Sequence, residues 1–131
     1  MMEKKVIYTK EAPEPVGPYS QAVALGNLLF CSGQIPLDSA SGEVFTGDIQ
    51  EQTRRVMANV AAVLAAAEMD FSNVVKTTIF LTDMGDFGAV NEVYATYFEA
   101  APPARSTVQV SALPKGVNVE IEVVAARGVN R

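Results

Sequence analysis

Two short runs of residues near the C-terminus carry the side chains best suited to chemistry. Arg105 and Thr107 lie two positions apart on the first run, and Glu120 and Glu122 lie two positions apart on the second. Both runs alternate with a period of two, which is typical of a β-strand with two different faces. If the runs pair as a hairpin about residues 111–116, Thr107 lies opposite Glu120 and Arg105 lies opposite Glu122. One face would then carry a cation, a hydroxyl and two carboxylates, which could hold a small carboxylic acid and a water molecule side by side.

Both principal residues also have a purely structural interpretation. Arg105 could form an ion pair with Glu122 or Glu120, since most ion pairs serve structure alone. Glu120 could simply face solvent, as most strand glutamates do. Spacing alone favours these structural interpretations over a functional one.

Composition narrows the chemistry that the chain can perform. The 131 residues suffice for one domain, 1–131, and the 49% of hydrophobic residues argue against disorder. There is no histidine and only one cysteine, Cys31, so we predict no zinc or copper site and no internal disulfide. Acid–base chemistry must come from carboxylates, tyrosine, lysine or water. We interpret Cys31 as a buried apolar residue, since nothing adjacent would activate it.

Charge and hydropathy bear on partners and location. The formal net charge is −5 and there is no lysine or arginine tract, which argues against nucleic acid as the main partner. The longest apolar stretch, Val60–Ala67, is far shorter than the roughly 20 residues needed to cross a membrane. No signal peptide is evident at the N-terminus. We therefore expect a cytoplasmic protein without a membrane partner.

Periodicity and turn residues predict the order β-ββ-α-β-α-ββ. The expected strands are 6–9, 22–25, 28–32, 73–82 and the two C-terminal runs, and the expected helices run from Asp48 to about 69–70 and from Asp83 or Asp86 to before Pro102. This order predicts an α+β fold, a single mixed sheet with two helices packed on one face. The other face would expose apolar residues, so we expect an oligomer to bury it.

Several short motifs, taken together, resemble one known family. They are Gly17-Pro18-Tyr19-Ser20-Gln21, Ser32-Gly33-Gln34-Ile35-Pro36, Gly42-Glu43, Asn91-Glu92-Val93-Tyr94, Pro103-Ala104-Arg105-Ser106, Leu113-Pro114-Lys115 and Val119-Glu120-Ile121-Glu122. Their order and spacing are similar to those of the RidA (YjgF) family over nearly the whole chain. The resemblance implies a chorismate-mutase-like fold, a homotrimer and active sites between subunits. It also implies hydrolysis of 2-imino (enamine) acids to 2-oxo acids and ammonia, which protects pyridoxal-phosphate enzymes, with no cofactor.

The resemblance also assigns roles to residues. It implies that Arg105 binds the substrate carboxylate and that Glu120 positions the attacking water. The other positions that match the family's cleft are Tyr19, Ser32, Gly33 and Asn91. Thr107 departs from the pattern, because many members have cysteine there; it keeps a backbone N–H at the site and adds a hydroxyl.

Two other functions stay open at this point. A ribonuclease or translation inhibitor is a label also attached to the family, although the acidic charge and missing histidines argue against it. A non-catalytic trimer that binds 2-oxo acids, as a sensor or chaperone-like protein, would use the same cleft. Because both binding and turnover would use Arg105, the sequence cannot separate them.

Overall fold

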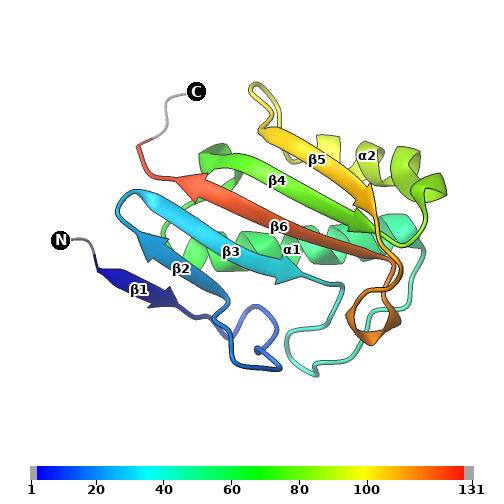
Figure 1. Cartoon of the computed structure of the whole chain (residues 1–131), viewed down its shortest axis with the longest axis horizontal. Helices are drawn as coiled ribbons and strands as arrows, with labels where there is room; N and C mark the ends of the chain where they lie inside the picture. The colour runs from blue at the N-terminus through cyan, green and yellow to red at the C-terminus, as the bar shows by residue number, and fades with distance from the viewer. Residues whose placement is uncertain (1–2, 129–131) are drawn as a thin grey trace.

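The computed structural model describes residues 3–128, which form one six-stranded sheet with two α-helices packed against it (Figure 1). The elements are β1 (Lys4–Ile7), β2 (Ala22–Leu25), β3 (Leu28–Gln34), α1 (Ile49–Ala66), β4 (Val74–Leu81), α2 (Phe87–Ala95), β5 (Ala104–Gln109) and β6 (Val119–Ala126). Short 3-10 turns, η1 (Phe71–Asn73), η2 (Met84–Asp86) and η3 (Pro114–Gly116), lie in three of the connections. The predicted element order is confirmed.

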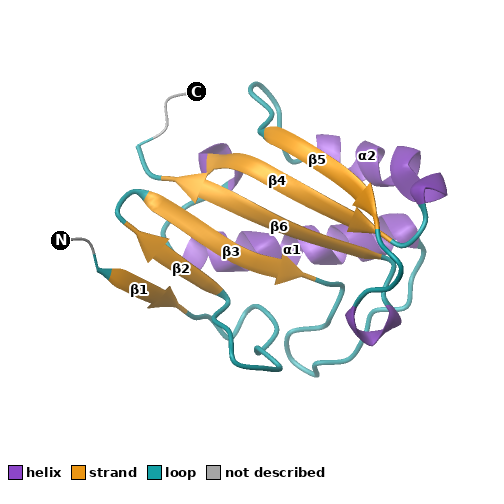
Figure 2. Cartoon of the chain, viewed as in Figure 1, coloured by secondary structure: helices purple, strands orange, loops and turns teal. Residues whose placement is uncertain are grey.

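The sheet has the strand order β1-β2-β3-β6-β4-β5. It is mixed, since β4 and β5 run parallel whereas the other neighbouring strands run antiparallel. Both helices cover the same face of the sheet and leave the other face open (Figure 2). The predicted α+β architecture, with one mixed sheet and two helices on one face, is therefore confirmed.

The predicted C-terminal hairpin is wrong. Strand β4 lies between β5 and β6, and Arg105 pairs in register with Thr77 of β4 rather than with Glu122. Helix α2 connects β4 to β5, and such a crossover allows the two strands to run parallel. Strand β6 then inserts between β3 and β4, so Thr107 does not lie opposite Glu120 either.

Several element boundaries also differ from the sequence prediction; α1, for example, ends at Ala66 and not near 69–70, and β3 extends to Gln34. The first strand spans Lys4–Ile7 instead of 6–9, because its pairing with β2 ends at Ile7. The residues Tyr97 and Phe98 were expected on the second helix but lie beyond its end. Their rings pack instead on Phe71 of η1, with ring centroids 5.1 and 5.6 Å away.

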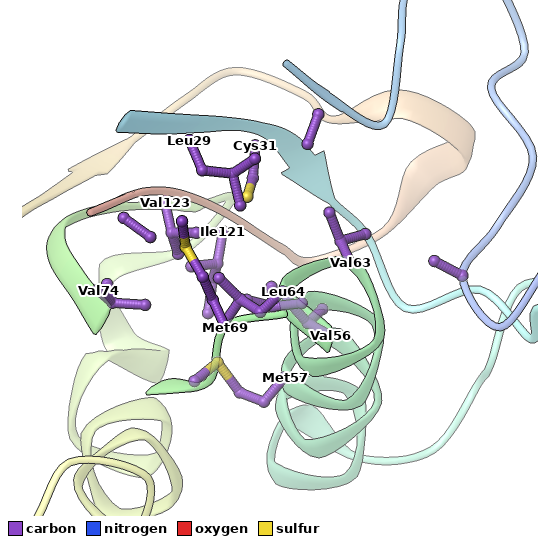
Figure 3. Close-up of a cluster of buried hydrophobic side chains, with 14 of the residues drawn as sticks. Leu29, Cys31, Val56, Met57, Val63, Leu64, Met69, Val74, Ile121 and Val123 are labelled. Carbon is purple, nitrogen blue, oxygen red and sulfur yellow. The ribbon is translucent and has the colours of Figure 1, made fainter. Parts of the chain in front are cut away.

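Helix α1 begins and packs as its sequence predicts. Asp48 caps it, and its Oδ1 accepts a hydrogen bond of 2.9 Å from the backbone N–H of Glu51. The apolar side of the helix then faces the sheet, and Val56 and Leu64 are fully buried there (Figure 3). Burial of this stripe fixes α1 against the middle of the sheet.

The core lies between α1 and the strands β3, β4 and β6. Leu29 and Cys31 of β3 and Ile121 and Val123 of β6 contribute to it (Figure 3). Burial raises the pKa of the Cys31 thiol to about 12, so this cysteine stays a protonated, unreactive core residue, as predicted. Within residues 3–128, no helix combines the length and apolar character needed to cross a membrane.

The open face of the sheet exposes apolar side chains. Val6, Phe30 and Val108 are 57%, 45% and 43% exposed, although each belongs to a strand. A sheet face with this much exposed hydrocarbon is typical of a surface that another chain covers.

Candidate active site

Glu120 lies in a pocket of about 430 Å³ at the end of the open sheet face. The pocket is formed by the loop after β1, the end of β3, the η3 turn and the start of β6. Its lining residues are Pro13, Glu14, Val16, Tyr19, Gln21, Ser32, Gly33, Gln34, Ile35, Leu37, Pro114, Lys115, Glu120 and Glu122. We call it the Glu120 pocket. It brings together four of the predicted site residues: Tyr19, Ser32, Gly33 and Glu120.

Gly33 makes room for the Glu120 carboxylate. Pairing between β3 and β6 shifts register between Cys31 and Gln34, so the strand bulges at Ser32 and Gly33. A Cβ on Gly33 would lie 2.1 Å from Oε2 of Glu120. The absence of a side chain at this position is therefore what lets the carboxylate rest against the β3 backbone.

The pKa of Glu120 is raised above the ordinary range of a glutamate. The main cause is burial, and the second is repulsion from the neighbouring Glu122 carboxylate. Among the described residues, no hydrogen-bond donor reaches the Glu120 carboxylate. A half-buried carboxyl group with a raised pKa and no partner is suited to exchanging a proton with a molecule in the pocket.

Tyr19 and Ser32 flank this carboxylate in different ways. The Tyr19 hydroxyl lies 3.3 Å from the backbone N–H of Val16, which donates to it, and the side chain is 48% exposed. The Ser32 hydroxyl donates to the backbone oxygen of Ser20 at 2.6 Å. Tyr19 thus has its ring and its hydroxyl proton available to a ligand, whereas the Ser32 proton is already used.

Arg105 and Asn91 lie elsewhere, between β5 and α2. Nη1 of Arg105 donates a hydrogen bond of 2.7 Å to Oδ1 of Asn91. The guanidinium carbon also lies 5.0 Å from the ring centroid of Tyr94 and 5.4 Å from that of Phe87, within cation–π distance. We call these four residues the Arg105 cluster.

Thr107 follows Arg105 on the same side of β5. Its register partner is Ile79, which is fully buried beneath the helices. The Thr107 hydroxyl is buried and has no hydrogen-bond partner within residues 3–128. Buried hydroxyl groups in native proteins nearly always have a partner, so within residues 3–128 this one is an exception.

The two groups of residues are on opposite faces of the sheet. Arg105 pairs in register with Thr77, which is buried on the helix side of the sheet. The Arg105 side chain also contacts α2 through Tyr94. Glu120 alternates with the buried residues Val119 and Ile121, so it points to the open side. The expectation that one face of one chain carries both groups is wrong. Glu120 and Glu122 do share a face, as predicted.

Four residues of these sites were missed by the sequence interpretation. Glu14 and Lys115 reach the Glu120 pocket from loops, for which sequence periodicity gives no signal. Neither Phe87 nor Tyr94 was assigned a role at the site. Their spacing from Asn91, four and three residues, places all three on one side of a helix and could have indicated a shared contact.

Two other features of the described residues do not add to the site. A pocket of about 490 Å³ lies beneath residues 96–104 and contains none of the predicted residues. Within residues 3–128, no group of three or more histidine, cysteine, aspartate or glutamate side chains could hold a metal ion.

Comparison with known proteins finds similar sequences and structures over nearly the whole chain. Residues 9–127 match the family described as Endoribonuclease L-PSP. The chain is 59% identical over 126 residues to protein DfrA of Myxococcus xanthus, covering 95% of this chain and 96% of DfrA. It is 50% identical over 125 residues to the 2-iminobutanoate/2-iminopropanoate deaminase of Mus musculus, covering 95% and 93% of the two chains. The crystal structure of E. coli TdcF with bound serine has a TM-score of 0.90 and 45% identity, with coverage of 95% and 99%.

Proposed function

The chain belongs to the Endoribonuclease L-PSP (RidA/YjgF) family, and from that premise we propose that it hydrolyses small 2-imino acids to 2-oxo acids and ammonia. The observation that carries this proposal is the Glu120 carboxylate, half-buried in a pocket with a raised pKa and no donor from the described residues. The name of the mouse relative, a 2-iminobutanoate/2-iminopropanoate deaminase, supports the same reaction.

The reaction needs only modest assistance from the protein. The carbon of a C=N bond is already electrophilic, and protonation of the nitrogen makes it more so. Glu120 accepts a proton from water as the oxygen attacks this carbon, which gives a carbinolamine. The carbinolamine nitrogen takes up that proton from Glu120, the C–N bond breaks and ammonia leaves, and the hydroxyl proton passes back to the Glu120 carboxylate as the C=O bond of the 2-oxo acid forms. The carboxylates of Glu120 and Glu122 favour the positively charged nitrogen species on this path.

Arg105 supplies the group that binds the substrate carboxylate. A guanidinium has five N–H donors, and one of them is bonded to Asn91. The others suit a planar carboxylate, which they can bind in a bidentate manner.

A complete site requires two chains. Arg105 faces the helix side at the edge strand β5, and Glu120 faces the open side of the same sheet. A second copy that covers the open face would bring its edge strand toward the Glu120 pocket. We therefore place the reaction between subunits of a homo-oligomer, which the family resemblance makes a homotrimer.

Ribonuclease activity, which the family description raises, fits the pocket less well. Glu14, Glu120 and Glu122 place three carboxylates there with Lys115 as the one cation among its lining residues, and this balance repels a phosphodiester. The chain has no histidine and a net charge of −5. Binding of 2-oxo acids without turnover is the remaining alternative. Measuring the rate of ammonia release from an imine distinguishes it from hydrolysis.

The test is ammonia release from 2-iminobutanoate that an amino-acid dehydratase generates in situ, with semicarbazide trapping the imine that remains. We expect purified protein to accelerate release and Arg105→Ala to remove the acceleration. Arg54→Ala, an exposed arginine on α1, is the matched control and should keep full activity. A folded Arg105→Ala variant with wild-type activity would contradict the proposed function.

A further inference from the structure

Arg105, Thr77 and Tyr94 form a closed set of three contacts. Thr77 is the register partner of Arg105 across β4 and β5. The Thr77 Oγ1 and Tyr94 Oη lie 2.7 Å apart and form a buried hydrogen bond. The ring of Tyr94 then returns to Arg105, with its centroid 5.0 Å from the guanidinium carbon. The hydroxyl end of Tyr94 is therefore fixed to the sheet while its face meets the cation.

The geometry points to Tyr94 as a positioning residue for substrate binding, which holds the Arg105 guanidinium so that its free N–H groups face the ligand. This inference rests on the proposed function, because it assumes that Arg105 binds a carboxylate. Arginine side chains are flexible, and an unsupported one would lose rotamer freedom each time it binds. Stacking against Tyr94 and Phe87 and the hydrogen bond to Asn91 remove that freedom before the ligand arrives.

Tyr94 is better placed for this role than its neighbours. It is 6% exposed, and Thr77 is 1% exposed, so neither can shift without disturbing the core. The Phe87 ring is only partly buried and has no hydroxyl to anchor it. Asn91 fixes one nitrogen of the guanidinium but does not set the plane of the group. The ring of Tyr94 lies under the guanidinium carbon and is itself anchored, so it limits where the group can move.

Three substitutions separate positioning from packing. Tyr94→Leu removes the ring face, and Tyr94→Phe keeps it while removing the hydroxyl. Tyr97→Leu is the matched control, since Tyr97 packs its ring on Phe71 and has no contact with Arg105. KM and kcat for 2-iminobutanoate are measured for each variant, together with the urea midpoint of unfolding.

We expect Tyr94→Leu to raise KM by about 3- to 30-fold, the range that a lost cation–π contact gives, and to change kcat by less than about threefold. Tyr94→Phe should raise KM by no more than about threefold, because the ring remains although it loses its anchor on Thr77. Tyr97→Leu should lower the midpoint without changing KM. An unchanged KM in Tyr94→Leu, or an equal rise in Tyr94→Phe, would overturn the role of the ring.

A second readout does not depend on turnover. The Hε proton of Arg105, assigned by its loss in Arg105→Lys, should show an upfield ring-current shift in the NMR spectrum of the wild type. Tyr94→Leu should reduce this shift and weaken binding of 2-oxobutanoate in the same titration, whereas Tyr94→Phe should preserve both. If the wild type fails to hydrolyse imines, the proposed function fails while this titration still decides the role of Tyr94. If Tyr94→Leu does not fold, Phe87→Leu is used, with a smaller change of the same kind expected.

Discussion

Arg105 and Glu120 lie on opposite faces of one sheet, and the strand β4 separates the strands that carry them. Arg105 is held against α2 by Asn91 and two aromatic rings, and Glu120 rests on the backbone of Gly33 in a pocket on the other side. Each group is preorganised, yet they cannot meet within one chain. Under the proposed function, a single substrate molecule would contact both where two chains adjoin.

The repulsion between Glu122 and Glu120 gives a prediction about pH. The pKa of Glu120 is raised, so this group becomes protonated at a higher pH than an ordinary glutamate. Activity that needs its carboxylate form should therefore start to fall at a higher pH as the solution is acidified. Glu122→Gln removes one cause of the raised pKa, so the acidic limb of the kcat/KM profile should move to lower pH. The measurement is the rate of imine hydrolysis from pH 4 to pH 8.

The control for this shift is Glu68→Gln. Glu68 is an exposed carboxylate just beyond the end of α1 and does not line the Glu120 pocket. Its removal changes the net charge equally but should leave the acidic limb in place. A limb that moves equally in both variants would mean that net charge, and not the contact with Glu120, sets the profile.

Gly33→Ala tests the close approach of Glu120 to β3. The added Cβ would force the flexible carboxylate away from its position, at little cost in stability but with at least about a tenfold loss of kcat. Gly88→Ala is the comparison, since its Cβ meets nothing within 4 Å and alanine favours the helix by about 0.5–1 kcal/mol. Unfolding midpoints and kinetics are measured for both. Full activity in Gly33→Ala would show that the carboxylate does not need this position.

Replacing either of two threonines on neighbouring strands with valine should change the stability of the protein, in opposite directions for the two positions. Thr107→Val removes a buried hydroxyl that has no partner in the described residues, and should stabilise the protein by about 1 kcal/mol. Thr77→Val breaks the buried hydrogen bond to Tyr94 and should destabilise it by about 1 kcal/mol. Urea midpoints at one fixed protein concentration measure both effects. If Thr107→Val is destabilising, its hydroxyl has a partner in the assembled protein.

The local elements could be predicted because local signals determine them. Asp48 marks the start of α1, and Gly26, with a positive φ of 59°, forms the turn of the β2–β3 hairpin. The partner of β6 could not be predicted in this way. Alternation along β5 and β6 shows that each has two faces but does not show which strand lies beside it.

That missing pairing explains the main error about the site. Treating β5 and β6 as a hairpin placed Arg105 on the same face as Glu120, whereas the insertion of β6 beside β4 places them apart. The family motifs pointed to these candidate residues without showing their arrangement. The raised pKa of Glu120 depends on burial and on the Glu122 carboxylate, and only the folded structure gives the degree of burial.

The most direct test of the account mixes two inactive variants, Arg105→Ala and Glu120→Gln. The subunits carry different tags, are co-expressed in equal amounts, and are shown by native mass spectrometry to assemble together. If each site takes its arginine and its glutamate from adjacent subunits, random mixing restores about one quarter of the sites in a cyclic oligomer.

Ammonia release from 2-iminobutanoate should therefore be absent from each variant alone and return to about a quarter of the wild-type rate in the mixture. A mixed oligomer that stays inactive, or a single variant that is already active, would contradict a site shared between Arg105 of one chain and Glu120 of another.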